Sequence, residues 1–171
     1  MRTLILGGAR SGKSQLAERL AQESQLAVTY IATAQAQDAE MAQRIAAHRA
    51  RRPAHWACIE EPLALANTLK AHAAAGRCLL VDCLTLWLTN LLLHPDPAMF
   101  DRERAALLDA LSDLPGQIIL VSNEIGLGVM PLGELTRRYC DEAGVLHQEL
   151  ATRCEHVLLT VAGISLTLKG T

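Results

Sequence analysis

Residues 7–14 carry the most specific chemical pattern of the sequence. They read Gly-Gly-Ala-Arg-Ser-Gly-Lys-Ser and fit the phosphate-loop pattern GxxxxGK followed by Ser or Thr. Glycines here let backbone N–H groups turn toward an anion, and a helix beginning near Lys13 directs its positive dipole end to the same place. We expect Lys13 to contact the outer phosphates of a nucleotide and Ser14 to offer its hydroxyl to Mg²⁺, whereas a glycine-rich turn without a ligand is the less specific interpretation. The expected nucleotide contacts of this loop are Gly7, Gly8, Ala9, Arg10, Ser11, Gly12, Lys13 and Ser14.

Asp82 ends a second apolar run, residues 78–81, that is typical of a buried strand. In a parallel sheet this carboxylate emerges at the same edge as the phosphate loop, where it can hold the water shell of Mg²⁺. The alternative is that Asp82 caps a helix that begins near Leu84.

Asn123 and Glu124 follow a further apolar run, residues 117–122, and are expected at that same edge. Glu124 has the chemistry of a general base or of a metal contact, and Asn123 could contact the substrate. An ordinary strand-to-helix turn explains the same residues equally well.

His48 lies four residues after Arg44 on a helix expected over about residues 38–50, so the two side chains share a face. Three more arginines follow within four residues, and this positive surround favours the neutral, nucleophilic imidazole. Such a nitrogen can displace pyrophosphate from an α-phosphorus and form an N–P bond. A surface histidine beside a solvated basic face is the more common arrangement. The other five histidines lack metal-ligand spacing and are interpreted as structural.

The overall composition limits the classes of function. The chain has 171 residues, half of them hydrophobic, which predicts one domain over residues 1–171. Its 16 basic and 18 acidic residues give a formal charge of −2, and aromatic residues make up 3%. No net basic field or stacking platform therefore favours nucleic acid as a partner.

Two further features bear on location. The five cysteines include no CxxC pair, so neither a disulfide framework nor a zinc site is indicated. The apolar segments are too short for a signal-peptide core or a membrane span. We expect a cytoplasmic protein without a membrane span.

Short apolar runs alternate with helical patterns along the chain, which predicts an α/β fold with a mostly parallel central sheet and helices on both faces. The expected strands are at about residues 3–6, 28–32, 56–59, 78–82, 117–122 and 156–162, with a possible edge strand at 165–169. The expected helices are at about residues 13–23, 38–50, 63–75, 84–92, 101–111 and 132–153.

Several separate segments, in this order, resemble the bifunctional adenosylcobinamide kinase/adenosylcobinamide-phosphate guanylyltransferase family of cobalamin biosynthesis. The match runs nearly from end to end. The segments that carry it are residues 7–14, 30–33, 40–41, 44–45, 48–53, 56, 82–85, 89–90, 123–128 and 161–164.

The resemblance implies two reactions. ATP or GTP phosphorylates the aminopropanol hydroxyl of adenosylcobinamide, and GTP then transfers GMP to that phosphate, which gives adenosylcobinamide-GDP and pyrophosphate. It further implies that His48 carries GMP as a phosphoramidate; some relatives have adjacent histidines, whereas this chain has Ala47-His48. The family resembles phosphate-loop proteins of the recombinase type and forms trimers, so a homotrimer that binds a corrinoid is expected. The nucleotide contacts implied outside the loop are Ala32, Thr33, Ala34, Arg49, Ala50, Arg51, Arg52, Glu60 and Asp82, with Glu61 an alternative to Glu60.

Two other functions remain as alternatives. One is a simple phosphate-loop kinase for another small alcohol, in which His48 takes no part. The other is a nucleotide-binding switch or assembly subunit whose slow hydrolysis controls a partner. The first transfers a γ-phosphoryl group without a covalent nucleotide, and the second has no small-molecule acceptor.

Overall fold

The structure, a computed structural model, describes residues 1–35, 43, 46 and 52–170. Within these residues, seven strands form one sheet in the order β3-β2-β4-β5-β1-β6-β7. All neighbouring strands are parallel except β7, which runs antiparallel to β6. Six carboxyl ends therefore meet at one edge of the sheet. The strands are β1 (Arg2–Gly7), β2 (Ala27–Ala32), β3 (Ala57–Glu60), β4 (Arg77–Asp82), β5 (Gln117–Asn123), β6 (His156–Val161) and β7 (Ile164–Lys169).

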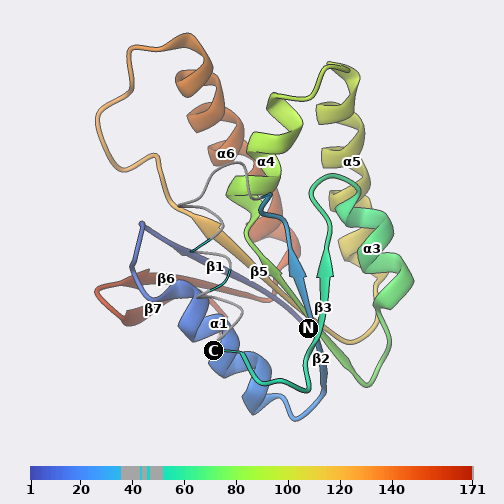
Figure 1. Cartoon of the computed structure of the whole chain (residues 1–171). Helices are drawn as coiled ribbons and strands as arrows, with labels where there is room; N and C mark the ends of the chain where they lie inside the picture. The colour runs from blue at the N-terminus through green and yellow to red at the C-terminus, as the bar shows by residue number, and fades with distance from the viewer. Residues whose placement is uncertain (36–42, 44–45, 47–51, 171) are drawn as a thin grey trace.

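Helices cover both faces of this sheet, with α1 on one face and the other described helices on the opposite face (Figure 1). Successive residues of each central strand point to opposite faces of the sheet. In β1, Leu4 packs in the cluster that contains α3–α6, whereas Ile5 packs with Leu16 and Ala17 of α1. Because both faces are covered, the central strands are apolar throughout. The described helices are α1 (Lys13–Glu23), α3 (Leu65–His72), α4 (Leu84–Leu92), α5 (Ala98–Asp113) and α6 (Glu134–Arg153).

The expected fold class and the described elements are confirmed, with differences at some ends. The helix expected over residues 101–111 begins earlier, at Ala98, where the Asp96 carboxylate accepts a hydrogen bond from the first helical N–H at 3.0 Å. The helix expected over 63–75 is shorter, at Leu65–His72. The helix expected over 38–50 lies outside the described residues except for Gln43 and Ala46, which are helical.

In the part of the chain that the structure describes, no helix is both long and apolar enough to cross a bilayer.

Candidate active site

The phosphate loop joins β1 to α1, as its sequence predicts. Gly12 immediately precedes α1 and has a φ of 96°, and Arg10 has a φ of 55°. The loop turns tightly, with the Ser11 N–H donating to the Gly8 carbonyl oxygen at 3.3 Å. Backbone in alternating left- and right-handed conformations forms concave nests of N–H groups that bind anions. Residues 7–14 therefore have the local geometry of a phosphate site at the amino end of a helix.

The chain around the turn between β6 and β7 packs against this loop. The Gly163 N–H donates to the Ser11 carbonyl oxygen at 2.8 Å. A Cβ atom on Gly12 would lie 3.2 Å from the Cα of Gly163, and one on Gly7 would lie 2.6 Å from the carbonyl oxygen of Thr160. The close approach explains why the loop needs glycine at these two positions.

Lys13 is the first residue of α1 and is 8% exposed. Its ammonium donates to the Gly8 carbonyl oxygen at 3.0 Å, so the charge is held against the phosphate loop. Burial lowers the pKa of Lys13, and the nearby Asp82 carboxylate partly opposes this effect. A buried cation with little water around it is well suited to bind phosphate oxygens.

Asp82 lies at the end of β4 and is half-buried. The Tyr30 hydroxyl donates to its Oδ2 atom at 3.0 Å, and the Arg52 guanidinium lies 3.6 Å from the centre of the Tyr30 ring. Burial, followed by the nearby Asp82 charge, raises the pKa of Tyr30, so this phenol remains a hydrogen-bond donor. The expected alternative, that Asp82 caps α4, is wrong: Cys83 occupies that position, and no side chain caps the helix there.

The oxygen atoms at this edge suit Mg²⁺. The Ser14 hydroxyl and the Asp82 carboxylate are hard ligands of the kind Mg²⁺ prefers, and Mg²⁺ usually keeps several waters while it contacts substrate phosphates. Among the described residues, no group of three or more His, Cys, Asp and Glu side chains could enclose a metal. This donor set suits an ion held partly by nucleotide phosphates, and Ser14 and Asp82 remain its predicted protein contacts.

Thr33 ties the end of β2 to the end of β4. Its side chain is fully buried; the hydroxyl donates to the Cys83 carbonyl oxygen at 2.7 Å and accepts from the Cys83 N–H at 3.0 Å. The Asn90 amide donates to the Thr33 carbonyl oxygen at 2.9 Å. The neighbouring residues Ala32 and Ala34 are partly exposed. The Thr33 hydroxyl therefore has a structural role, and a nucleotide contact at residues 32–34 remains a prediction.

The two adjacent glutamates after β3 differ in their surroundings. Glu61 accepts hydrogen bonds from the N–H groups of Leu63 and Ala64 at 2.9 and 2.7 Å, so its carboxylate is used at the start of α3. Glu60 is the last residue of β3 and is exposed. Of the two carboxylates, that of Glu60 is the exposed one, and its contact with guanosine remains a prediction.

Asn123 and Glu124 lie directly beside the phosphate loop. Asn123 pairs in register with Gly7, and the Glu124 N–H donates to the Gly7 carbonyl oxygen at 2.9 Å. The Asn123 amide donates to the Thr85 hydroxyl at 3.0 Å. The Glu124 Oε1 atom accepts from the Gly126 N–H at 2.6 Å. This arrangement fixes both side chains at the edge of the sheet where the nucleotide phosphates are expected.

His147 on α6, which we interpreted from the sequence as structural, lies against two residues at the end of β5, and the sequence did not indicate these contacts. Its Nε2 atom lies 2.8 Å from the Ser122 Oγ atom, and its Nδ1 atom lies 3.8 Å from the Glu124 Oε2 atom. A lone histidine on a helix gives no sequence signal of such contacts. Its position on the face of α6 that carries Ala143, Leu146 and Leu150 indicated burial only.

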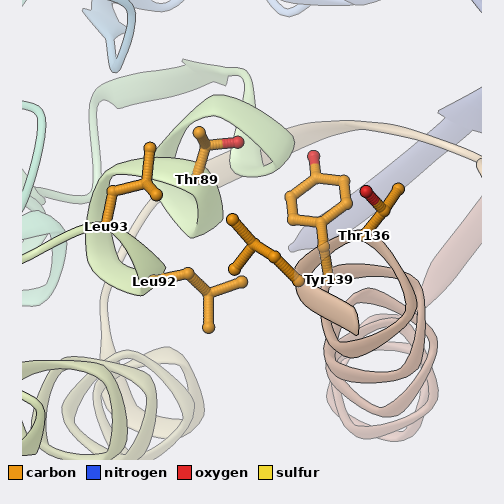
Figure 2. Close-up of a pocket in the computed structure, with 6 residues that line it drawn as sticks. Thr89, Leu92, Leu93, Thr136 and Tyr139 are labelled. Atoms are coloured by element: carbon orange, nitrogen blue, oxygen red, sulfur yellow. The ribbon is translucent and has the colours of Figure 1, made fainter. Parts of the chain in front are cut away.

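An apolar pocket of about 190 Å³ opens between α4 and α6 near this edge (Figure 2). The Tyr139 hydroxyl donates to the Thr85 carbonyl oxygen at 3.0 Å. Because the Thr85 hydroxyl also accepts from Asn123, the pocket and the end of β5 share a hydrogen-bonded framework. The pocket is lined by Thr89, Leu92 and Leu93 from α4 and its end, and by Leu135, Thr136 and Tyr139 from α6.

The remaining predicted site residues, His48, Arg49, Ala50 and Arg51, lie outside the described residues. Arg52, which ends this basic run, is described and stacks on Tyr30. The structure thus brings together the phosphate loop, Asp82, Glu124 and, through Tyr30, the end of the basic run.

Comparison with known proteins identifies the fold and the family of the chain. The fold is similar to that of the RadB recombinase at a TM-score of 0.52, with 17% identity over 92% of this chain and 73% of that chain. The bifunctional adenosylcobalamin biosynthesis protein CobP of Pseudomonas aeruginosa is 74% identical, over 99% of this chain and 98% of the relative. The corresponding protein CobU of Escherichia coli is 38% identical, over 99% of this chain and all of the relative. Residues 3–168 match the family described as cobinamide kinase / cobinamide phosphate guanyltransferase, and the chain belongs to that family.

Proposed function

We propose that this chain phosphorylates adenosylcobinamide with ATP or GTP and then transfers GMP from GTP to the resulting phosphate through a guanylyl-histidine at His48. The observation that carries the proposal is a phosphate loop of the required geometry in a chain of the cobinamide kinase / cobinamide phosphate guanyltransferase family. Lys13, whose ammonium is held against the loop backbone, supplies charge that both reactions need, because the phosphate oxygens carry negative charge in each transition state.

In the first reaction, the acceptor hydroxyl oxygen forms a bond to the γ-phosphorus, and the bond to the β–γ bridging oxygen breaks. The hydroxyl proton must go to a base close to the phosphate loop. Glu124 is suited to that role, because its backbone N–H bonds to Gly7 and its carboxylate lies at the same edge of the sheet. Asn123, fixed by Thr85, is placed to contact the acceptor.

In the second reaction, an imidazole nitrogen of His48 forms an N–P bond to the α-phosphorus of GTP, and the bond to the α–β bridging oxygen breaks to release pyrophosphate. A phosphate oxygen of the cobinamide phosphate then displaces the histidine. This role of His48 is supported by the family resemblance and by the positive charge of the residues that follow it. The basic run ends at Arg52, and Arg52 stacks on the tyrosine that holds Asp82.

The nucleoside part of GTP is assigned to the carboxyl ends of β2 and β3. Glu60 is preferred to Glu61 for a guanosine contact, because Glu61 already accepts hydrogen bonds at the start of α3. A carboxylate suits the N–H donors of guanine and the hydroxyls of ribose. Backbone groups at Ala32, Thr33 and Ala34, together with residues 49–52, complete the proposed nucleotide site.

The metal, the oligomeric state, the location and the partners also belong to the proposal. When bound, Mg²⁺ neutralises phosphate charge, and Ser14 and Asp82 would hold it. The chain works as a homotrimer in the cytoplasm. The corrinoid is a small-molecule partner, and neither nucleic acid nor a membrane takes part.

Product analysis tests the two reactions. Purified protein is incubated with adenosylcobinamide, Mg²⁺ and either ATP or GTP, and the corrinoid products are identified by mass spectrometry. We expect one added phosphate with ATP alone, and an added GDP moiety once GTP is present. Phosphorylation without any guanylylated product would favour the alternative of a simple kinase. If the protein binds nucleotide but forms no corrinoid product, the alternative of a nucleotide-binding switch would be favoured.

A further inference from the structure

His147 lies between two groups at the end of β5 and belongs to a different part of the chain, the middle of α6. The His147 side chain is 9% exposed. Its Nε2 atom lies 2.8 Å from the hydroxyl of Ser122, which is itself buried, and its Nδ1 atom lies 3.8 Å from Oε2 of Glu124. Each ring nitrogen therefore faces a different partner.

Burial lowers the pKa of His147, and the Glu124 carboxylate partly opposes this effect. A neutral imidazole has one N–H donor and one acceptor nitrogen. The Ser122 hydroxyl can donate to Nε2, which leaves the proton on Nδ1, facing the carboxylate. We assign this tautomer because it satisfies both partners at once.

Each oxygen of the Glu124 carboxylate then faces a different N–H group. Oε1 accepts from the Gly126 N–H at 2.6 Å, and Oε2 faces His147 Nδ1. At 3.8 Å, the contact with Nδ1 is longer than a hydrogen bond, as is common for catalytic contacts without substrate. The Glu124 N–H, bonded to the Gly7 carbonyl oxygen, keeps this carboxylate next to the phosphate loop.

We propose that His147 is a positioning residue for the phosphorylation reaction, and that its Nδ1–H orients the Glu124 carboxylate to accept the proton of the acceptor hydroxyl. This inference rests on the proposed function. As the hydroxyl oxygen bonds to the γ-phosphorus and the bridging oxygen leaves with the nucleoside diphosphate, the proton moves to Glu124. His147 itself touches neither substrate and gives up no proton.

Two substitutions of His147 distinguish the roles of its two ring nitrogens. An asparagine amide reaches the position of Nδ1, toward Glu124, whereas a glutamine amide reaches the position of Nε2, toward Ser122. We expect His147→Gln to lower kcat for phosphorylation by about tenfold or more with little change in KM for ATP, an effect typical of residues that orient a reacting group. His147→Asn should retain most of that rate.

Guanylyl transfer provides the internal control, measured on the same preparations with cobinamide phosphate already formed. It should remain near the wild-type rate in both variants, because it needs no base for a hydroxyl proton. Equal loss of phosphorylation in Asn and Gln, equal loss of both reactions, or an unchanged rate in both variants would overturn the inference. An inactive wild-type protein would instead overturn the proposed function.

Ser122→Ala keeps the test decisive if the His147 variants do not fold. It removes the hydroxyl that fixes Nε2 while retaining the imidazole. We expect a smaller fall in the phosphorylation kcat, with guanylyl transfer spared. Loss of neither reaction, or equal loss of both in folded Ser122→Ala protein, would again overturn the inference.

Discussion

Replacing Thr33 by valine removes the hydroxyl that joins the ends of β2 and β4 and keeps the shape of the side chain. Thr33 is fully buried, so no water can replace the lost partner at the Cys83 N–H. An orphaned buried donor costs about 1–3 kcal/mol. The Cys83 carbonyl oxygen still accepts from the Trp87 N–H at 3.3 Å, so its lost bond costs only about 0.5–1.5 kcal/mol. We expect the free energy of unfolding to fall by about 1.5–4.5 kcal/mol.

Urea denaturation followed by circular dichroism measures this change. Thr33→Ser is the matched control, because it keeps the hydroxyl and both hydrogen bonds and loses one methyl group, worth about 0.8 kcal/mol. The valine variant should therefore be clearly less stable than the serine variant. If Thr33→Val unfolds at the same urea concentration as the wild type or as Thr33→Ser, the hydroxyl does not join these strands and the reasoning is refuted.

Three other substitutions test the remainder of the site. Lys13→Ala removes the charge beside the phosphate loop, so both reactions should fall by about 100-fold or more in steady-state assays, and loss of only one would contradict a shared loop. Asp82→Asn should raise the Mg²⁺ concentration needed for half-maximal rate, and an unaltered titration would remove Asp82 from the metal site. Gly7→Ala brings a methyl group to 2.6 Å from the Thr160 carbonyl oxygen and should cost about 1–3 kcal/mol of unfolding free energy. Gly76→Ala, which meets no atom within 4 Å, should cost far less, and equal thermal unfolding would contradict the packing argument.

The phosphate loop and its surroundings could be predicted because their signals are local. A glycine with positive φ, a lysine at the first helical position and an apolar strand before them all lie within residues 2–14. The position of Asp82 followed from one further step, because parallel strands place their carboxyl ends at one edge. These predictions needed no knowledge of how distant segments pack.

The separate roles of Glu60 and Glu61 and the contacts of His147 could not be predicted in this way. Glu60 and Glu61 are identical in type, and only the start of α3 shows that Glu61 is used locally. His147 meets Ser122 across 25 residues of sequence, and this contact depends on the position of α6 over the sheet. In both cases the deciding information is the packing of one element on another, which residue type and spacing do not specify.

The central claim, that His48 carries the guanylyl group, is tested most directly by incubating the protein with GTP labelled at the α-phosphate and Mg²⁺, without acceptor. His55→Ala is the control, because His55 is an exposed histidine close by in the sequence. We predict covalent label that is stable in alkali, labile in acid, present in wild type and His55→Ala, and lost in His48→Ala. Label that persists in folded His48→Ala, or no label in wild-type protein that binds GTP, would contradict the account.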